Sequence, residues 1–84
     1  MHEMGIAGSI LDAVQKELLR YPGYYPVKID VRVGEYAGID PESLQFCFGA
    51  IVKDTRFSSL ELALQPCGGD ELDLGNLELE EVVS

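Results

Sequence analysis

Apolar residues recur every three or four positions over the first quarter of the chain. The positions with this spacing are Met4, Ala7, Ile10, Leu11, Val14, Leu18 and Tyr21. Because an α-helix turns once in about 3.6 residues, this spacing places them on one face of an amphipathic helix. Proline disfavours a helical residue before it and glycine turns freely, so Pro22 and Gly23 are expected to end the helix. The pattern predicts a helix over residues 4–20.

The period of the pattern changes to two in residues 27–33. The apolar residues there are Val27, Ile29, Val31 and Val33, and the charged residues between them are Lys28, Asp30 and Arg32. Successive side chains of a strand point to opposite faces, so this alternation predicts a β-strand with one buried and one solvated face. Residues 34–38 are expected to form the loop that follows.

A second helix is predicted to begin at Asp40. The Asp40 carboxylate can accept hydrogen bonds from the first backbone N–H groups, and Pro41 suits the first helical position. The apolar residues that follow are Leu44, Phe46, Cys47, Phe48, Ile51 and Val52. Because they cover much of the girth, we expect this helix to be well buried, with Cys47 in the core, and to end at Lys53.

Two further segments, residues 60–64 and 77–80, alternate like strands, and residues 66–76 between them predict a loop containing Gly68-Gly69 and Gly75-Asn76. Three strands cannot hide their apolar face alone, so both helices are expected to cover one face of a three-stranded sheet. The predicted fold class is α+β, in the order α-β-α-β-β, as a single domain over residues 1–84. If the first two strands are parallel neighbours, their connection is a right-handed crossover.

Composition narrows the possible functions. The net charge is −9, from fifteen acidic and six basic side chains, which disfavours nucleic-acid binding and favours a cation or a basic partner. No apolar run approaches the roughly 18–20 residues that cross a bilayer, and the first residues do not resemble a signal peptide. Two cysteines do not make a secreted disulfide framework, so we expect a cytoplasmic protein that binds neither membranes nor nucleic acid.

The first three residues offer a metal chelate. Met1 supplies an α-amine if its terminus is free, His2 supplies an imidazole and a backbone nitrogen, and Glu3 supplies an amide or a carboxylate. Nitrogen donors on adjacent residues favour square-planar Ni(II) or Cu(II) over zinc. The alternative is that the tripeptide binds nothing, as in many proteins with a polar residue after the initiator methionine.

The sequence does not predict an enzyme. His2 is the only histidine, and the chain contains neither a Ser/His/Asp set nor a phosphate-binding glycine loop. Catalysis by Glu35, Asp40 and Glu42 is a distant alternative, because carboxylates alone on a loop are usually solvated.

Three segments resemble the HypA/HybF family: residues 1–7 (MHEMGIA), 34–39 (GEYAGI) and 41–48 (PESLQFCF). Members of this family are nickel metallochaperones for NiFe-hydrogenase maturation, and some also serve urease. The resemblance implies Ni(II) bound by Met1, His2 and Glu3, and two partners, a nickel-insertion GTPase and the hydrogenase large subunit. Asp40 stands where some members are thought to add a nickel ligand, but an Asp before Pro at a helix start is more often a cap.

The chain departs from the family between its second and third strands. Members ordinarily carry a zinc module there, held by two Cys-x-x-Cys pairs, whereas this stretch contains only Cys67. Cys67 resembles the last cysteine of a missing module, with the junction near residues 66–76, so zinc is not expected. A chain without that module has a second possible function, as a metal-free interaction module that docks a maturation partner through its first helix.

Overall fold

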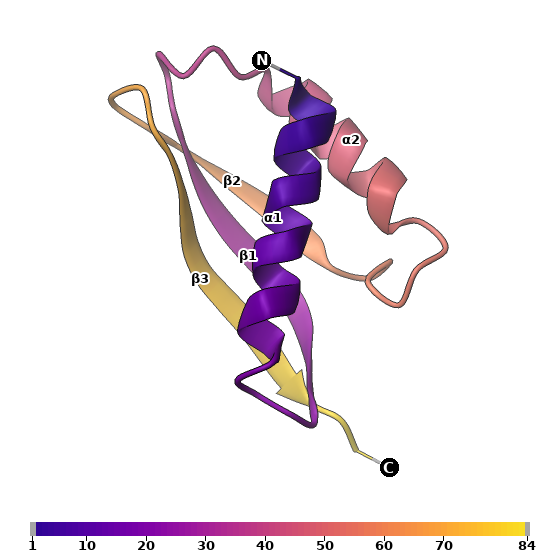
Figure 1. Cartoon of the computed structure of the whole chain (residues 1–84). Coiled ribbons are helices and arrows are strands. Elements are labelled where there is room, and N and C mark those ends of the chain that lie inside the picture. Colours follow the sequence, from indigo (N-terminus) through magenta and orange to yellow (C-terminus); the bar gives the residue numbers. More distant parts are fainter. Residues whose placement is uncertain (1, 84) are drawn as a thin grey trace.

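The computed structural model describes residues 2–83, which form two helices and a three-stranded sheet, with α1 in front of the sheet and α2 beside α1 in Figure 1. In chain order the elements are α1 (Glu3–Leu18), β1 (Tyr24–Gly34), α2 (Pro41–Val52), β2 (Glu61–Cys67) and β3 (Leu72–Glu81). The predicted α+β class and the predicted α-β-α-β-β order are confirmed. Within residues 2–83, neither helix combines the length and the apolar composition that a membrane-spanning segment requires.

The sheet has the strand order β2-β1-β3, with β1 in the centre. β1 and β2 are parallel and pair from Lys28 with Glu61 to Gly34 with Cys67, so α2 is the crossover between parallel neighbours. β1 and β3 are antiparallel and pair from Tyr24 with Glu81 to Val33 with Leu72. β2 and β3 are therefore the two edges of the sheet formed by the described residues.

The core lies between the two helices and the sheet. Its buried residues are Ala7, Ile10, Val14, Ile29, Val31, Val33, Leu44, Phe48, Val52, Phe57, Leu60 and Leu62. They come from both helices, from β1 and β2, and from the segment between α2 and β2. β3 supplies no buried residue to the described core, because Leu72, Leu77 and Leu79 are only half-buried.

Two predictions of burial were wrong. Phe46 is 77% exposed, because it lies about 200° around α2 from Leu44, whose face meets the core. Cys47, which was predicted to lie in the core, is half-buried and packs against the core. Val27 is also only half-buried, since β1 begins earlier than predicted and the pairing register with β3 shifts between Pro26 and Lys28. The alternation holds for the rest of β1.

The predicted long loop over residues 66–76 was also wrong. β2 continues to Cys67 and β3 begins at Leu72, so residues 68–71 alone connect the two edge strands. This connection crosses the end of β1, where the Gly34 N–H donates to the Glu71 carbonyl at 2.8 Å and the Tyr36 N–H to the Gly69 carbonyl at 2.9 Å. A Cβ on Gly34 would lie 2.6 Å from the Gly69 oxygen, so the crossing requires glycine there.

Gly75 and Asn76, expected in a loop, lie inside β3. The register between β1 and β3 passes from Ile29 opposite Leu77 to Val31 opposite Leu74, so two residues of β3 face Asp30 alone. This extra length makes a β-bulge, which bends the strand locally. A Cβ on Gly75 would come within 3.2 Å of the Asp30 carbonyl oxygen, which explains the residue type at the bulge.

Candidate metal site

His2 is the residue that precedes α1. Its backbone is extended, with φ −92° and ψ 116°, and its carbonyl accepts the first helical hydrogen bond from the Ile6 N–H at 3.2 Å. Its side chain is exposed and makes no capping hydrogen bond with the described part of the helix. The imidazole is therefore free to bind a ligand, and the first backbone N–H groups of α1 lack intrahelical acceptors. Met1, the other predicted nitrogen donor, lies outside the described residues.

Glu3 joins the start of α1 to the start of α2. Its Oε2 accepts a hydrogen bond from the Asp40 N–H at 3.4 Å, across 37 positions of sequence. Of the four predicted site residues, the structure thus places three, His2, Glu3 and Asp40, at one end of the molecule. The start of α1 and the start of α2 lie together at the top of Figure 1.

Asp40 caps α2, which was one of its two predicted roles. Its Oδ1 accepts hydrogen bonds from the Glu42 N–H at 3.0 Å and the Ser43 N–H at 3.4 Å. Its Oδ2 accepts from the Ser43 hydroxyl at 3.1 Å. Pro41 occupies the first turn, as expected for a residue without an N–H group. Both carboxylate oxygens of Asp40 are therefore engaged in holding the helix start.

Within residues 2–83, no three His, Cys, Asp or Glu side chains lie together in a way that could hold a metal ion. His2, Glu3 and Asp40 do not make a side-chain ligand set by themselves. A metal site at this end would therefore need donors other than these three side chains. Cys47 and Cys67 are both half-buried free thiols on separate elements, α2 and β2.

An apolar cavity of about 590 Å³ lies beside His2. It is lined by His2, Gly5, Ile6, Ser9, Ile39 and Leu72. The last two residues come from the loop before α2 and from the first position of β3. Sequence reasoning missed them, since Leu72 was placed in a loop, although the alternation of Leu72, Asp73 and Leu74 was an available signal.

Comparison with known proteins identifies the relatives of this chain. Residues 1–78 match the model of the family described as "Hydrogenase/urease nickel incorporation, metallochaperone, hypA". The hydrogenase maturation factor HypA of Pelodictyon phaeoclathratiforme is 49% identical over 55 residues, covering 66% of this chain and 47% of that protein. The factor of the same name from Chlorobaculum parvum is 44% identical over 68 residues, covering 80% of this chain and 59% of that protein.

The chain thus spans about half the length of the curated relatives that it matches. Among solved structures, the nickel metallochaperone HypA of Helicobacter pylori superposes with a TM-score of 0.73 over 100% of both chains. Its sequence identity to this chain is 12%, so this likeness is evidence for the fold alone.

Proposed function

Because this chain belongs to the HypA family, we propose that it is a nickel metallochaperone, which binds Ni(II) at its N-terminus and delivers it for hydrogenase maturation. The observation that carries the proposal is the position of His2. The only imidazole of the chain is exposed, precedes α1 directly and makes no capping hydrogen bond to the described helix. The HypA relatives are named hydrogenase maturation factors, which agrees with a role in binding and transfer.

The proposed ligands are the Met1 amine, the His2 imidazole and backbone nitrogen, and Glu3. Adjacent nitrogen donors suit the square-planar geometry that Ni(II) accepts. The net charge of −9 adds a favourable long-range field for a cation. Ni(II) is the cargo here, so an exposed site at a chain end serves release as well as capture.

Asp40 has a supporting role in this proposal. Ligation by its carboxylate would compete with three hydrogen bonds at the start of α2. Its backbone N–H instead reaches the Glu3 carboxylate, so Asp40 helps to set the position of Glu3 relative to His2. We therefore assign Asp40 to positioning and treat nickel ligation by its side chain as the weaker alternative.

The partners proposed for transfer are those that the family resemblance implies, a nickel-insertion GTPase and the hydrogenase large subunit, in the cytoplasm. A second candidate function is a metal-free interaction module for the same machinery. The apolar cavity beside His2 favours it, because Ile6, Ile39 and Leu72 offer a partner an apolar surface at this end.

A nickel titration by calorimetry separates these two functions. The chain with a free Met1 amine is expected to bind about one Ni(II), and the N-acetylated chain to bind far more weakly. Affinity should fall as the pH drops from about 8 to 6, because the amine and the imidazole must be deprotonated to bind the metal. His2→Ala should abolish binding while leaving the circular dichroism spectrum unchanged. Equal nickel affinities for the free and acetylated chains would rule out the chelate. The metal-free interaction module would then be the remaining candidate function.

A further inference from the structure

The outer edge of β2 is protected against pairing with another strand. The Cys67 carbonyl points toward β1, where it accepts a hydrogen bond from the Glu35 N–H at 3.0 Å, so the neighbouring Pro66 turns its backbone outward. Pro66 has no N–H group to donate there. Leu62 also faces outward, and its carbonyl already accepts a hydrogen bond from the Gln45 side chain at 2.6 Å. Proline and occupied carbonyl groups of this kind make an edge strand a poor template for another chain.

The outer edge of β3 lacks this protection beyond its bulge. The Val82 N–H donates to the carbonyl of Gly23, the residue before β1, at 2.8 Å. By the alternation of a strand, the residues of β3 that direct their N–H and C=O groups away from β1 are Leu77, Leu79 and Glu81. The bulge ends before Leu77, and the other pairing irregularity adds a residue to β1 and not to β3. This stretch of β3 therefore offers a regular row of backbone groups at a sheet edge of the described chain.

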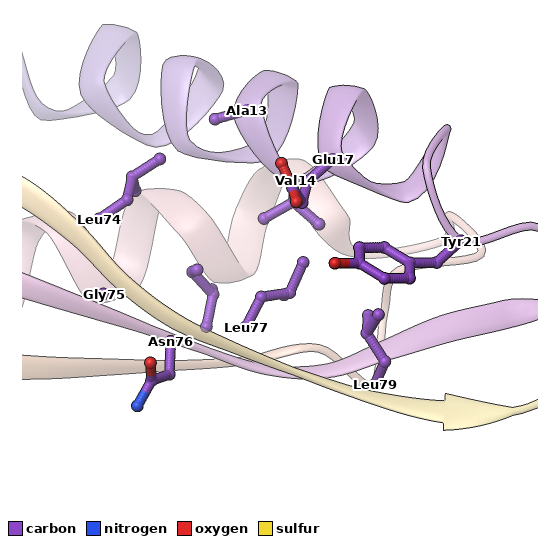
Figure 2. Close-up of a pocket in the computed structure, with 10 residues that line it drawn as sticks. Ala13, Val14, Glu17, Tyr21, Leu74, Gly75, Asn76, Leu77 and Leu79 are labelled. Carbon is purple, nitrogen blue, oxygen red and sulfur yellow. The ribbon is translucent and has the colours of Figure 1, made fainter.

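A strand added to this edge would meet different side chains on the two faces of β3. Figure 2 shows Leu77 and Leu79 pointing toward α1, into an open groove of about 550 Å³ between α1 and β3. The floor of the groove includes Val14, which is 2% exposed. Glu78 and Glu80 alternate with the two leucines, so they lie on the opposite face of the sheet, where they are exposed. An added strand contacts both faces, because its own side chains alternate in the same way.

The charges on the outward face indicate the chemistry of the added strand. Glu78 lies opposite Lys28, but Lys28 also pairs with Glu61 of β2, so acidic groups are in excess around it. Glu80 lies opposite Tyr25 and accepts a hydrogen bond from its uncharged hydroxyl. Lysine or arginine directly opposite these two glutamates of β3 would stabilise the pairing. Two antiparallel copies of β3 would instead place glutamate opposite glutamate, which disfavours a second copy of this chain as the occupant.

We propose that the outer edge of β3 binds an extended segment of a partner protein as a fourth, antiparallel strand with alternating apolar and basic residues. The apolar residues lie opposite Leu77 and Leu79 and exchange backbone hydrogen bonds with them, and the basic residues lie opposite Glu78 and Glu80. In edge addition the main chain supplies affinity and alternate side chains supply specificity. β3 ends at the bottom of Figure 1, whereas α1 begins at the top, so this site does not depend on nickel binding.

The first test uses the full chain, labelled with ¹⁵N, and a capped peptide of about nine residues in which valine and lysine alternate. The peptide should shift the amide signals of residues 77–81 and slow the hydrogen exchange of the Leu79 and Glu81 N–H groups, which face outward. About 500 mM NaCl should weaken binding, because the glutamate–lysine pairs are exposed. Signal shifts without slower exchange at these two residues would contradict an added strand.

Backbone methylation of the peptide separates an added strand from attraction by charge alone. In the proposed pairing the valine N–H groups donate to β3, whereas the lysine N–H groups point away from it. A peptide with N-methylated central valines should bind at least about ten-fold more weakly, because two backbone hydrogen bonds are lost. A peptide with N-methylated central lysines should keep its affinity within about two-fold. Equal affinities of the two methylated peptides would overturn the proposal.

Glu78→Gln and Glu61→Gln make a matched pair of protein variants. Both residues are exposed, lie opposite Lys28 on the same face of the sheet and lose one negative charge, but Glu61 belongs to β2. Glu78→Gln should weaken binding of the unmethylated peptide by about two- to five-fold, and Glu61→Gln should leave it nearly unchanged. Equal losses in the two variants would place the peptide elsewhere and overturn the proposal. Nickel titrations of both variants should match the wild type, which keeps this outcome separate from that of the metal site.

Discussion

β2 and β3 both flank β1, but the helices cover them very differently. Leu62 of β2 is 4% exposed, and its carbonyl accepts a hydrogen bond from the Gln45 side chain of α2 at 2.6 Å. Leu74 of β3 is 44% exposed and faces the open groove beside α1. Two helices, each about 10 Å wide, pack over β1 and β2 in this fold and leave the third strand partly bare.

This difference indicates a division of labour within the sheet. The side with β2 buries Leu62 under α2, and we expect this side to contribute more to the free energy of folding than the side with β3. The side with β3 pairs with β1 through its backbone, and its apolar side chains are half-buried or, for Leu74, exposed. Four experiments test or sharpen this division, from the largest expected effect to the smallest.

Leucine truncation on the two edges should have very different costs. Leu62→Ala is expected to lower the free energy of unfolding by about 2–5 kcal/mol, because it leaves a cavity under α2. Leu74→Ala should cost less than about 1 kcal/mol, since nearly half of this side chain is already in water. Urea denaturation measures both values, and similar losses for the two variants would contradict the comparison.

Gly34→Ala tests the connection that joins the two edges. The added methyl group would lie 2.6 Å from the Gly69 oxygen and 2.9 Å from the Glu71 nitrogen, so residues 68–71 must move. We expect a loss of about 1–3 kcal/mol in stability, as for other overpacked sites. Gly49→Ala is the control, because its methyl group enters open space on α2. Gly38→Ala is not a matched control, because φ of Gly38 is +72°. Faster hydrogen exchange at residues 34–36 in Gly34→Ala alone would confirm the local origin.

Asp40 variants test the cap that begins the helix over β2. Asp40→Ala should cost about 0.5–2 kcal/mol, because the Glu42 and Ser43 N–H groups lose their acceptor. Asp40→Asn should be nearly silent in thermal unfolding, since asparagine caps about as well. Nickel calorimetry on the same variants tests whether the Asp40 carboxylate is instead a nickel ligand. A drop of about tenfold or more in the nickel affinity of Asp40→Asn, at unchanged stability, would make Asp40 a ligand.

The smallest expected effect on stability comes from Tyr25 of β1, which pairs with Glu80 of β3. A hydrogen bond from its hydroxyl to Glu80, with the negative charge of that carboxylate, raises the pKa of Tyr25 above 10.0. Only the neutral phenol donates this bond, so its contribution to stability is present below pH 10 and is lost as the pH rises through the raised pKa. Ultraviolet absorbance titrations of the wild type and of Tyr25→Phe differ by one component, the ionisation of the Tyr25 phenol. This component should appear above pH 10. Glu80→Gln should move that component down toward the ordinary value.

Local patterns predicted the elements of the fold, but not the details that depend on strand pairing. The alternation in residues 29–33 and the cap at Asp40 follow from neighbouring residues, and both are present in the structure. Gly75-Asn76 resembles a turn, and only its pairing opposite Asp30 makes it a bulge within a strand. Phe46 was misjudged because an apolar helix can be exposed on the side that no other element covers.

The candidate site was predictable to a similar degree. His2 and Glu3 could be proposed from their position at the start of the chain, and the Asp40 cap from the proline that follows it. The approach of Ile39 and Leu72 to His2 could not be foreseen, because it depends on how residues 68–71 pass over the end of β1. Contacts between distant segments follow from topology, which the local periodicity does not contain.

The crossing over β1 also makes residues 68–71 a natural attachment point for further chain. A Cβ on Gly68 or Gly69 would meet no other atom within 4 Å, and φ of Gly69 is +96°, so these two residues form a turn that faces open space, although the Gly69 carbonyl accepts a hydrogen bond from the Tyr36 N–H. Leu72, which follows directly, lines the same cavity as His2. A domain inserted at this turn would be tethered beside the N-terminus of α1. Its side chains would then reach the proposed nickel site at the high effective concentration of a short linker.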